Sequence, residues 1–155
     1  RKLADSHAVT WVAGNHDRDA CPVAALLGCS FLPCHSFRSG GRTFVAVHGD
    51  VFDSFLDENP ALAWAADLAY GSLLRFHPGA ARLAKAGSKT FLRCREKVKE
   101  GALAYAERED IDAVLCGHTH HAELAGDYAN SGCWTEPVCH YLTVKRGEVR
   151  LWEYR

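Results

Sequence analysis

Three apolar runs rich in β-branched residues divide the chain, and each of them ends directly in a short polar string. The runs cover residues 8–13, 43–47 and 111–116, and the strings that follow are Gly14-Asn15-His16-Asp17, His48-Gly49-Asp50 and Gly117-His118-Thr119-His120. Runs of this kind are typical of buried parallel strands. Because ligands of open α/β sheets sit at the carboxyl ends of the strands, we expect the asparagine and the histidines of the three strings to converge.

The rest of the pattern predicts helices alternating with strands. Helices are expected over residues 20–27 and 90–109, and further strands over residues 31–37, 128–133, 141–145 and 148–154. Residues 59–77 predict another helix that is apolar on most of its surface, and such a helix must be buried or bind something apolar. The alternation predicts an α/β fold, and the length favours a single domain over residues 1–155.

Composition narrows the classes of protein to consider. The 155 residues are 48% hydrophobic and 24% charged, with a net charge of -1, which gives no electrostatic case for nucleic acid or an anionic membrane. The seven cysteines form no Cys-x-x-Cys pair, and this favours reduced thiols in a cytoplasmic protein. No run reaches the ~18 apolar residues of a membrane span.

The donor atoms in the three strings select a class of metal ion. Neutral imidazoles and an amide oxygen, without a thiolate, suit Mn, Fe, Co, Ni or Zn better than Mg or Ca. Two such ions about 3.5–4 Å apart can stabilise both the attacking and the leaving oxygen of a displacement at phosphorus. A catalytic metal centre is therefore the leading interpretation, and three ordinary polar turns are the alternative.

Taken in this order, the three strings resemble the last three of the five sequence blocks of the calcineurin-like metallophosphoesterases. The resemblance implies that Asn15, His48 and His118 bind one divalent ion and that His120 binds a second, with Mn²⁺ the first choice and Fe, Zn, Co or Ni as alternatives. It implies that a metal-activated hydroxide is the nucleophile. It also implies that His16 protonates the leaving oxygen while Asp17 holds the imidazole ring.

The family's fold is a layered β-sandwich flanked by helices, and this sequence departs from it at the start. The first two family blocks, Asp-x-His and Gly-Asp-x-x-Asp, are not found. Asp5-Ser6-His7 spells the first of them but precedes a strand instead of ending one. We therefore expect the N-terminal βαβ portion to be absent and a helical insertion at about residues 60–89. On this interpretation the chain holds most of one metal site and a single ligand of the other.

A looser resemblance concerns the substrate. Residues 48–53, the apolar helix and residues 128–136 resemble the UDP-2,3-diacylglucosamine diphosphatase group, whose best-known branch carries Arg where this chain has His16. This implies a phosphorylated small-molecule substrate, a UDP-linked acylated sugar, with the apolar helix covering the acyl chains. It also implies contact with the inner face of the membrane. Arg18 is placed to meet a phosphate oxygen, although an exposed arginine on a polar loop is an equal alternative.

Other interpretations stay open at this level. Within the enzyme interpretation, a nucleotide phosphodiesterase or nuclease is the second candidate. Outside it, the chain would be a non-catalytic truncated module that binds a metal or a nucleotide. Asp50 and Asp53 either orient His48 or cap the turn that follows it.

Overall fold

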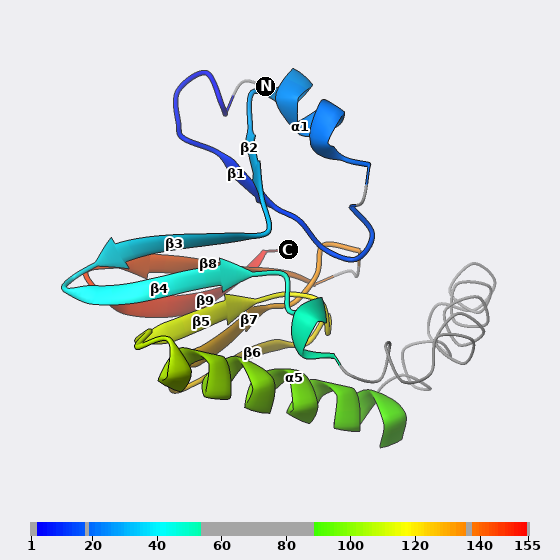
Figure 1. Ribbon diagram of the computed structural model, residues 1–155, viewed down its shortest axis with the longest axis vertical. Helices are drawn as coiled ribbons and strands as arrows, with labels where there is room; N and C mark the ends of the chain where they lie inside the picture. The colour runs from blue at the N-terminus through cyan, green and yellow to red at the C-terminus, as the bar shows by residue number, and fades with distance from the viewer. Residues whose placement is uncertain (1–2, 18, 54–88, 136–137, 155) are drawn as a thin grey trace.

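The computed structural model describes residues 3–17, 19–53, 89–135 and 138–154 (Figure 1). Their elements in chain order are β1 (Thr10–Val12), α1 (Cys21–Leu27), β2 (Ser30–Leu32), β3 (Cys34–Ser39), β4 (Arg42–Val47), the 3-10 turn η1 (Asp50–Phe52), α5 (Lys89–Arg108), β5 (Ala113–Cys116), β6 (Ala122–Ala125), β7 (Tyr128–Ser131), β8 (Cys139–Lys145) and β9 (Glu148–Tyr154). The predicted α/β fold is confirmed.

A five-stranded sheet with the order β3-β4-β5-β7-β6 organises the molecule. Its three central strands, β4, β5 and β7, are parallel, and the two edge strands β3 and β6 are antiparallel to their neighbours. The apolar runs of β4 and β5 therefore occupy the centre of the sheet, where both faces are covered. Their carboxyl ends lie at the same edge.

Helix α5 covers one face of this sheet. Ala102 and Ala106 of the helix pack against Val114, Cys116 and Tyr128 of the sheet, and these five residues form the buried core cluster. Burial raises the pKa of the Cys116 thiol and of the Tyr128 hydroxyl to about 12, because the charged form of each would be poorly solvated there. Figure 1 shows α5 along one side of the sheet, with β1, β2 and α1 on the other side.

The β8–β9 hairpin joins the sheet at the end remote from the polar strings. The buried Gly147 in its turn donates its backbone N–H to Ser39 Oγ at 3.2 Å, and its carbonyl accepts from Arg42 Nη1 at 3.1 Å. Ser39 and Arg42 flank the turn before β4, whereas His48 follows the opposite end of that strand. The hairpin also contacts β6 and β7.

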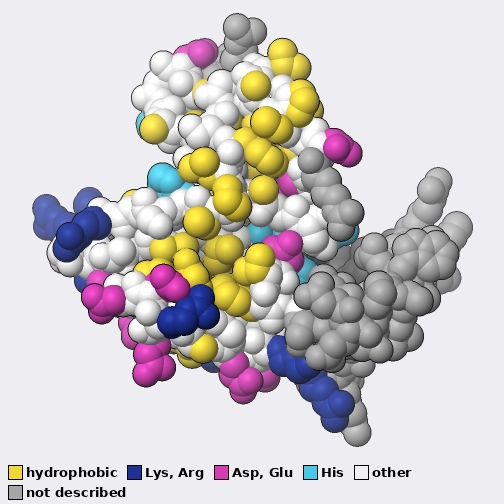
Figure 2. Space-filling view, viewed as in Figure 1, with side chains coloured by type: hydrophobic (Ala, Val, Ile, Leu, Met, Phe, Trp, Pro, Cys, Tyr) yellow, Lys and Arg dark blue, Asp and Glu magenta, His cyan; other side chains and the backbone are white. Residues whose placement is uncertain are grey.

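The two parallel strands β1 and β2, with α1 beside them, form a separate small unit. Figure 2 shows hydrophobic side chains gathered over this part of the molecule, where Leu3, Val23 and Leu26 are exposed. The break between this unit and the main sheet falls at Pro33. Proline cannot donate to a strand ladder, so the predicted strand over residues 31–37 is two strands, β2 and β3.

The structure can be compared with the other predicted helices and strands only where their residues are described. The predicted helix over residues 90–109 is α5, shifted by one residue at each end, and the predicted strands over residues 141–145 and 148–154 correspond to β8 and β9, which pair as an antiparallel hairpin. Strand β6 was not predicted, because four residues without a periodic apolar pattern give no strand signal. The apolar helix over residues 59–77 lies outside the described residues, as does almost all of the insertion expected at about residues 60–89.

Candidate metal centre

The three polar strings meet at one edge of the fold because each follows a strand. His48 comes directly after β4, Gly117 directly after β5, and Asn15 three residues after the end of β1. The backbone N–H of Gly117 donates to the carbonyl of His48 at 2.9 Å, which ties the second and third strings together. The expected convergence of these loops is therefore present in the described residues.

Asn15 and His48 lie in direct contact, although they are far apart in sequence. The distance between Asn15 Oδ1 and His48 Nε2 is 3.1 Å. Two ligand atoms about 2.1 Å from one ion, at a right angle to each other, are about 3.0 Å apart. The pair thus has the spacing of adjacent ligands, and in the chain alone His48 Nε2–H donates to the amide oxygen.

His118 completes a cluster with His48. The centroids of the two rings are 5.3 Å apart, and the rings meet edge to face. Burial lowers the pKa of His48, Asp50 opposes this by raising it, and His118 adds a smaller lowering effect. A lowered pKa keeps the imidazole neutral, which is the form that binds a metal ion. The donor set of one amide oxygen and two imidazoles fits a divalent transition metal.

Gly14 lets the first string approach the second. A Cβ built on Gly14 would lie 2.6 Å from three atoms of the His48 ring, closer than a real Cβ contact allows. Any larger residue here would push the imidazole away from Asn15. Glycine at this position is therefore favoured by the close approach of the His48 ring and not by an unusual backbone conformation.

We expect the substitution Gly14→Ala to weaken Mn²⁺ binding by about tenfold to a hundredfold, the typical cost of misorienting a ligand. Calorimetric titration of the chelator-treated protein with Mn²⁺ measures the change. Gly117→Ala is the matched control, because its added Cβ meets only the His48 carbonyl oxygen, at 3.7 Å. Equal affinities for both variants and the parent chain would mean that the His48 ring is not held where the structure has it.

The loop that carries the last two histidines has an uncommon backbone. His118 and His120 have φ angles of 61° and 55°, in the left-handed region that non-glycine residues seldom adopt. Residues held in this region cluster at functional sites when the surrounding structure compensates for the strain. His118 is largely buried, whereas His120 is exposed.

Asn130 on β7 supplies that compensation. Its side chain is fully buried, and its Nδ2 donates to the Gly117 carbonyl at 2.6 Å and to Thr119 Oγ1 at 3.1 Å. Its Oδ1 accepts from the Gly132 backbone N–H at 2.9 Å. No sequence signal indicates this role, since a lone Asn in a strand resembles a turn residue.

Asn130→Ala should destabilise the chain by roughly 2–4 kcal/mol, because it removes the side-chain hydrogen bonds to Gly117 and Thr119 and takes from the buried Gly132 N–H its acceptor. Urea unfolding followed by circular dichroism measures the free energy. Ser131→Ala, at the half-buried neighbouring position, is the control and should change stability much less. If both variants unfold at the parent's midpoint, Asn130 does not hold the loop.

The first string also contains the candidate catalytic residues. His16 is exposed, as a group that meets a substrate must be. Asp17 Oδ2 accepts from the Gly14 backbone N–H at 2.9 Å and from Trp11 Nε1 at 3.3 Å, so this carboxylate holds the loop that carries His16. The candidate substrate-binding residue Arg18 lies outside the described residues.

Two residues that the sequence did not assign to the centre lie beside His118. Asp53 Oδ2 is 2.9 Å from His118 Nε2, and Cys94 Sγ is 3.1 Å from the same oxygen. The sequence predicts that Asp53 orients His48 or caps the turn after it, and the structure shows its carboxylate in contact with His118. From the sequence, Cys94 is expected to be a core residue, because it belongs to the apolar face of α5. Its distance from Asp53 along the chain matches no known ligand motif, so the sequence does not predict their contact.

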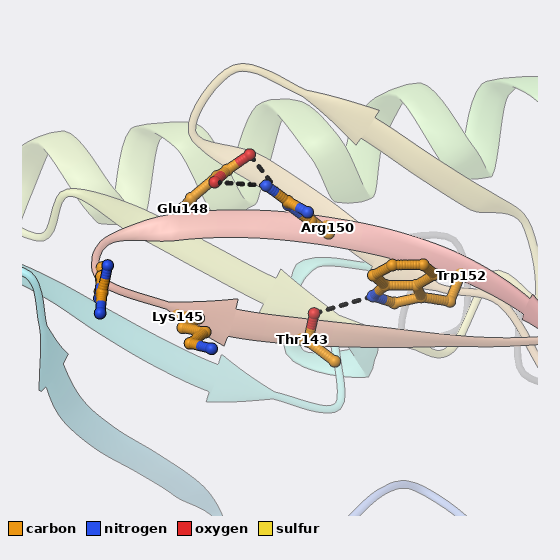
Figure 3. Close-up of a pocket in the computed structure, with 6 residues that line it drawn as sticks. Thr143, Lys145, Glu148, Arg150 and Trp152 are labelled. Carbon is orange, nitrogen blue, oxygen red and sulfur yellow. Dashed lines mark hydrogen bonds and ion pairs between the residues drawn. The ribbon is translucent and has the colours of Figure 1, made fainter.

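A pocket on the outer face of the β8–β9 hairpin is separate from this centre (Figure 3). Glu148 pairs with Arg150 through two contacts of 3.0 Å, and Trp152 Nε1 donates to Thr143 Oγ1 at 2.8 Å. None of the candidate site residues lines this pocket. It therefore contributes nothing to the assignment of the metal centre.

Comparison with known proteins agrees with this geometry. Residues 1–122 match the family model described as calcineurin-like phosphoesterase, a range that includes all three polar strings. No curated protein matches the chain. Among the described residues, no helix combines the length and apolar character that crossing a bilayer requires.

Proposed function

The chain belongs to the calcineurin-like phosphoesterase family, and on this premise we propose that it cleaves a phosphoester or pyrophosphate bond with the help of divalent metal ions. The observation that carries the proposal is the approach of Asn15 Oδ1 to within 3.1 Å of His48 Nε2. These atoms come from strings at the ends of two different strands. An amide oxygen and an imidazole nitrogen at this spacing can bind one ion.

The residues that would hold the metal ions are the four named from the sequence. Asn15, His48 and His118 would bind one ion, and His120, from the same loop as His118, would contribute to a second. Bound divalent ions would supply an activated water and withdraw charge from the phosphoryl oxygens. Mn²⁺ is the first ion to test, with Fe, Zn, Co and Ni as alternatives that suit the same donors.

His16 would donate the proton that the leaving oxygen requires. His16 is exposed and comes one residue after Asn15, a position that supports access to a substrate beside the proposed metal ligands. Asp17 supports this role through the backbone, because its carboxylate fixes the turn by accepting from Gly14 and Trp11. A general acid acts best when its position is fixed before the substrate arrives.

For the substrate we propose a UDP-linked 2,3-diacylglucosamine, cleaved at its pyrophosphate. The support is the sequence resemblance over residues 48–53 and 128–136, together with the apolar residues 59–77. Arg18 would contact a phosphate oxygen, for which a guanidinium is well suited. An acylated substrate would also bring the protein to the surface of a membrane, at the inner face where nucleotide sugars are available.

The experiment is an assay of the chelator-treated chain with and without Mn²⁺. UDP-2,3-diacylglucosamine is compared with UDP-glucose and with the general diester substrate bis(p-nitrophenyl) phosphate. Release of UMP from the acylated substrate alone, dependent on Mn²⁺, supports the full proposal, and turnover of the diester alone supports phosphoester hydrolysis of another substrate. Mn²⁺ binding without turnover of any of them would identify a non-catalytic metal-binding module.

A further inference from the structure

A buried carboxylate lies behind one of the candidate metal ligands. The Asp53 side chain is 4% exposed and the His118 side chain 11%, and Asp53 Oδ2 is 2.9 Å from His118 Nε2. Cys94 Sγ, on α5, is 3.1 Å from the same carboxylate oxygen. Burying a carboxylate is costly unless donors surround it, and two side chains from distant segments supply donors here.

The direction of these hydrogen bonds follows from the chemistry of the groups. An ionised carboxylate only accepts, so His118 Nε2 must carry the proton and Cys94 must donate its S–H. In a neutral imidazole with the proton on Nε2, the lone pair is on Nδ1. Asp53 thereby determines which nitrogen of His118 is available to an ion.

We propose that Asp53 is a positioning residue of the metal centre: it fixes His118 in the tautomer that leaves Nδ1 for the ion, and Cys94 holds the Asp53 carboxylate in place. This inference rests on the function proposed above, which assigns His118 to the metal ions. Carboxylates that accept from the second nitrogen of a metal-binding histidine orient the ring and increase its basicity.

The packing of η1 on α5 keeps the three side chains together. An added Cβ on Gly101 of α5 would lie 3.0 Å from Phe52 Cβ, so the absence of a side chain at that position allows the close approach. The rings of Phe52 and Tyr105 also meet, with centroids 5.8 Å apart. Cys94 is about three helical turns from Tyr105 on the same side of α5, and Asp53 directly follows Phe52.

Asp53, Cys94 and His118 could also hold an ion themselves, because their ligand atoms lie within 4.8 Å of one another. Around a tetrahedral zinc ion, a thiolate sulfur and a carboxylate oxygen are about 3.5 Å apart, and a nitrogen and an oxygen about 3.3 Å. The distances here are 3.1 Å and 2.9 Å, both shorter and both to one oxygen. An ion with ligands at right angles, about 3.0 Å apart, would allow these distances as well, so the Co²⁺ spectrum described below, and not the spacing, separates a bound ion from hydrogen bonds to a shared acceptor.

The first test is the tautomer of His118 in the metal-free chain, read from ¹H–¹⁵N correlation spectra of the imidazole nitrogens at a pH where the ring is neutral. We expect the Nε2–H form in the parent and a mixture of both forms in Asp53→Asn. Asp50→Asn is the matched control, because it removes the same charge three residues away and should leave the tautomer unchanged. The tautomer is measured without any hydrolysis. The role of Asp53 and the proposed function can therefore fail independently of each other.

The second test is Mn²⁺ affinity of the same variants, measured by calorimetry. Asp53→Asn should lose about tenfold to a hundredfold in affinity, and Cys94→Ala less than about tenfold, since a thiol is a weak donor. Thermal unfolding shows whether each variant folds. If Asp53→Asn does not fold, Asp53→Glu is measured in its place. An Nδ1–H tautomer in the parent chain would overturn the proposal, as would a pure Nε2–H tautomer in Asp53→Asn. A sulfur-to-metal charge-transfer band with Co²⁺ that disappears in Cys94→Ala would also overturn it, because Cys94 would then be a ligand.

Discussion

Replacing His48 with alanine should remove Mn²⁺-dependent hydrolysis almost completely, by about 10³-fold or more, because metal stabilisation of the reacting charge is worth several kcal/mol and each 1.4 kcal/mol is tenfold in rate. The variant loses one of three side chains expected to bind the same ion. His48 also contacts Asn15, so its removal leaves the amide oxygen without the neighbour that is 3.1 Å away. Calorimetric titration with Mn²⁺ and the hydrolysis assay measure the two effects on the same preparation.

His35→Ala is the matched control for this variant. His35 is a half-buried histidine of β3 whose ring stacks on Phe37, with centroids 5.8 Å apart, and it lies in none of the three strings. The control should bind Mn²⁺ as the parent does. If His48→Ala retains the parent's affinity and activity, the three strings do not form a metal centre. If it loses activity but binds Mn²⁺ normally, His48 contacts the substrate and not the ion.

Replacing His16 with alanine should reduce turnover by about 10²–10⁴-fold while Mn²⁺ binding stays unchanged, because general acid catalysis typically contributes that much. The effect should depend on the leaving group. An alkyl alcohol leaves only when protonated, so hydrolysis of an alkyl phosphodiester should fall by the full amount. p-Nitrophenol leaves as the anion, so hydrolysis of a p-nitrophenyl ester should fall much less.

The contrast between the two leaving groups separates proton donation from other roles. His7→Ala is the control, since His7 is an exposed histidine outside the three strings, with its Nδ1 2.8 Å from Ser6 Oγ. An equal loss for both substrates would mean that His16 binds the phosphoryl group and donates no proton to the leaving oxygen. An unchanged rate for both would remove His16 from the mechanism.

The placement of the strings could be predicted because it depends on local pattern. An apolar run such as residues 43–47 forms a strand wherever it is packed, and the next residue must leave the strand at its carboxyl end. His48 and Gly117 therefore follow β4 and β5 without reference to the rest of the chain. Helix α5 was equally predictable, because its apolar and charged positions repeat with the period of a helix.

The break at Pro33 and the short strand β6 show where local pattern was insufficient. Apolar residues lie on both sides of Pro33, between Phe31 and Phe37, and only the small separate unit of β1 and β2 shows that the chain changes sheets there. Strand β6 exists because β7 offers an edge for it to pair with. Proline explains why the strand stops at residue 33, but the sheet that each half joins, like the pairing of β6, is not encoded in a window of a few residues.

By itself, the sequence determined the class of fold, the order of the polar strings and the donor atoms that they carry. Only the tertiary structure decided which polar side chains meet: Asp17 with Trp11, Asn130 with Thr119, and Asp53 with both His118 and Cys94. The physical reason is that a hydrogen bond requires two atoms about 3 Å apart. For segments as distant in sequence as η1, α5 and the loop after β5, that separation is set by strand register and helix packing, which no local pattern specifies.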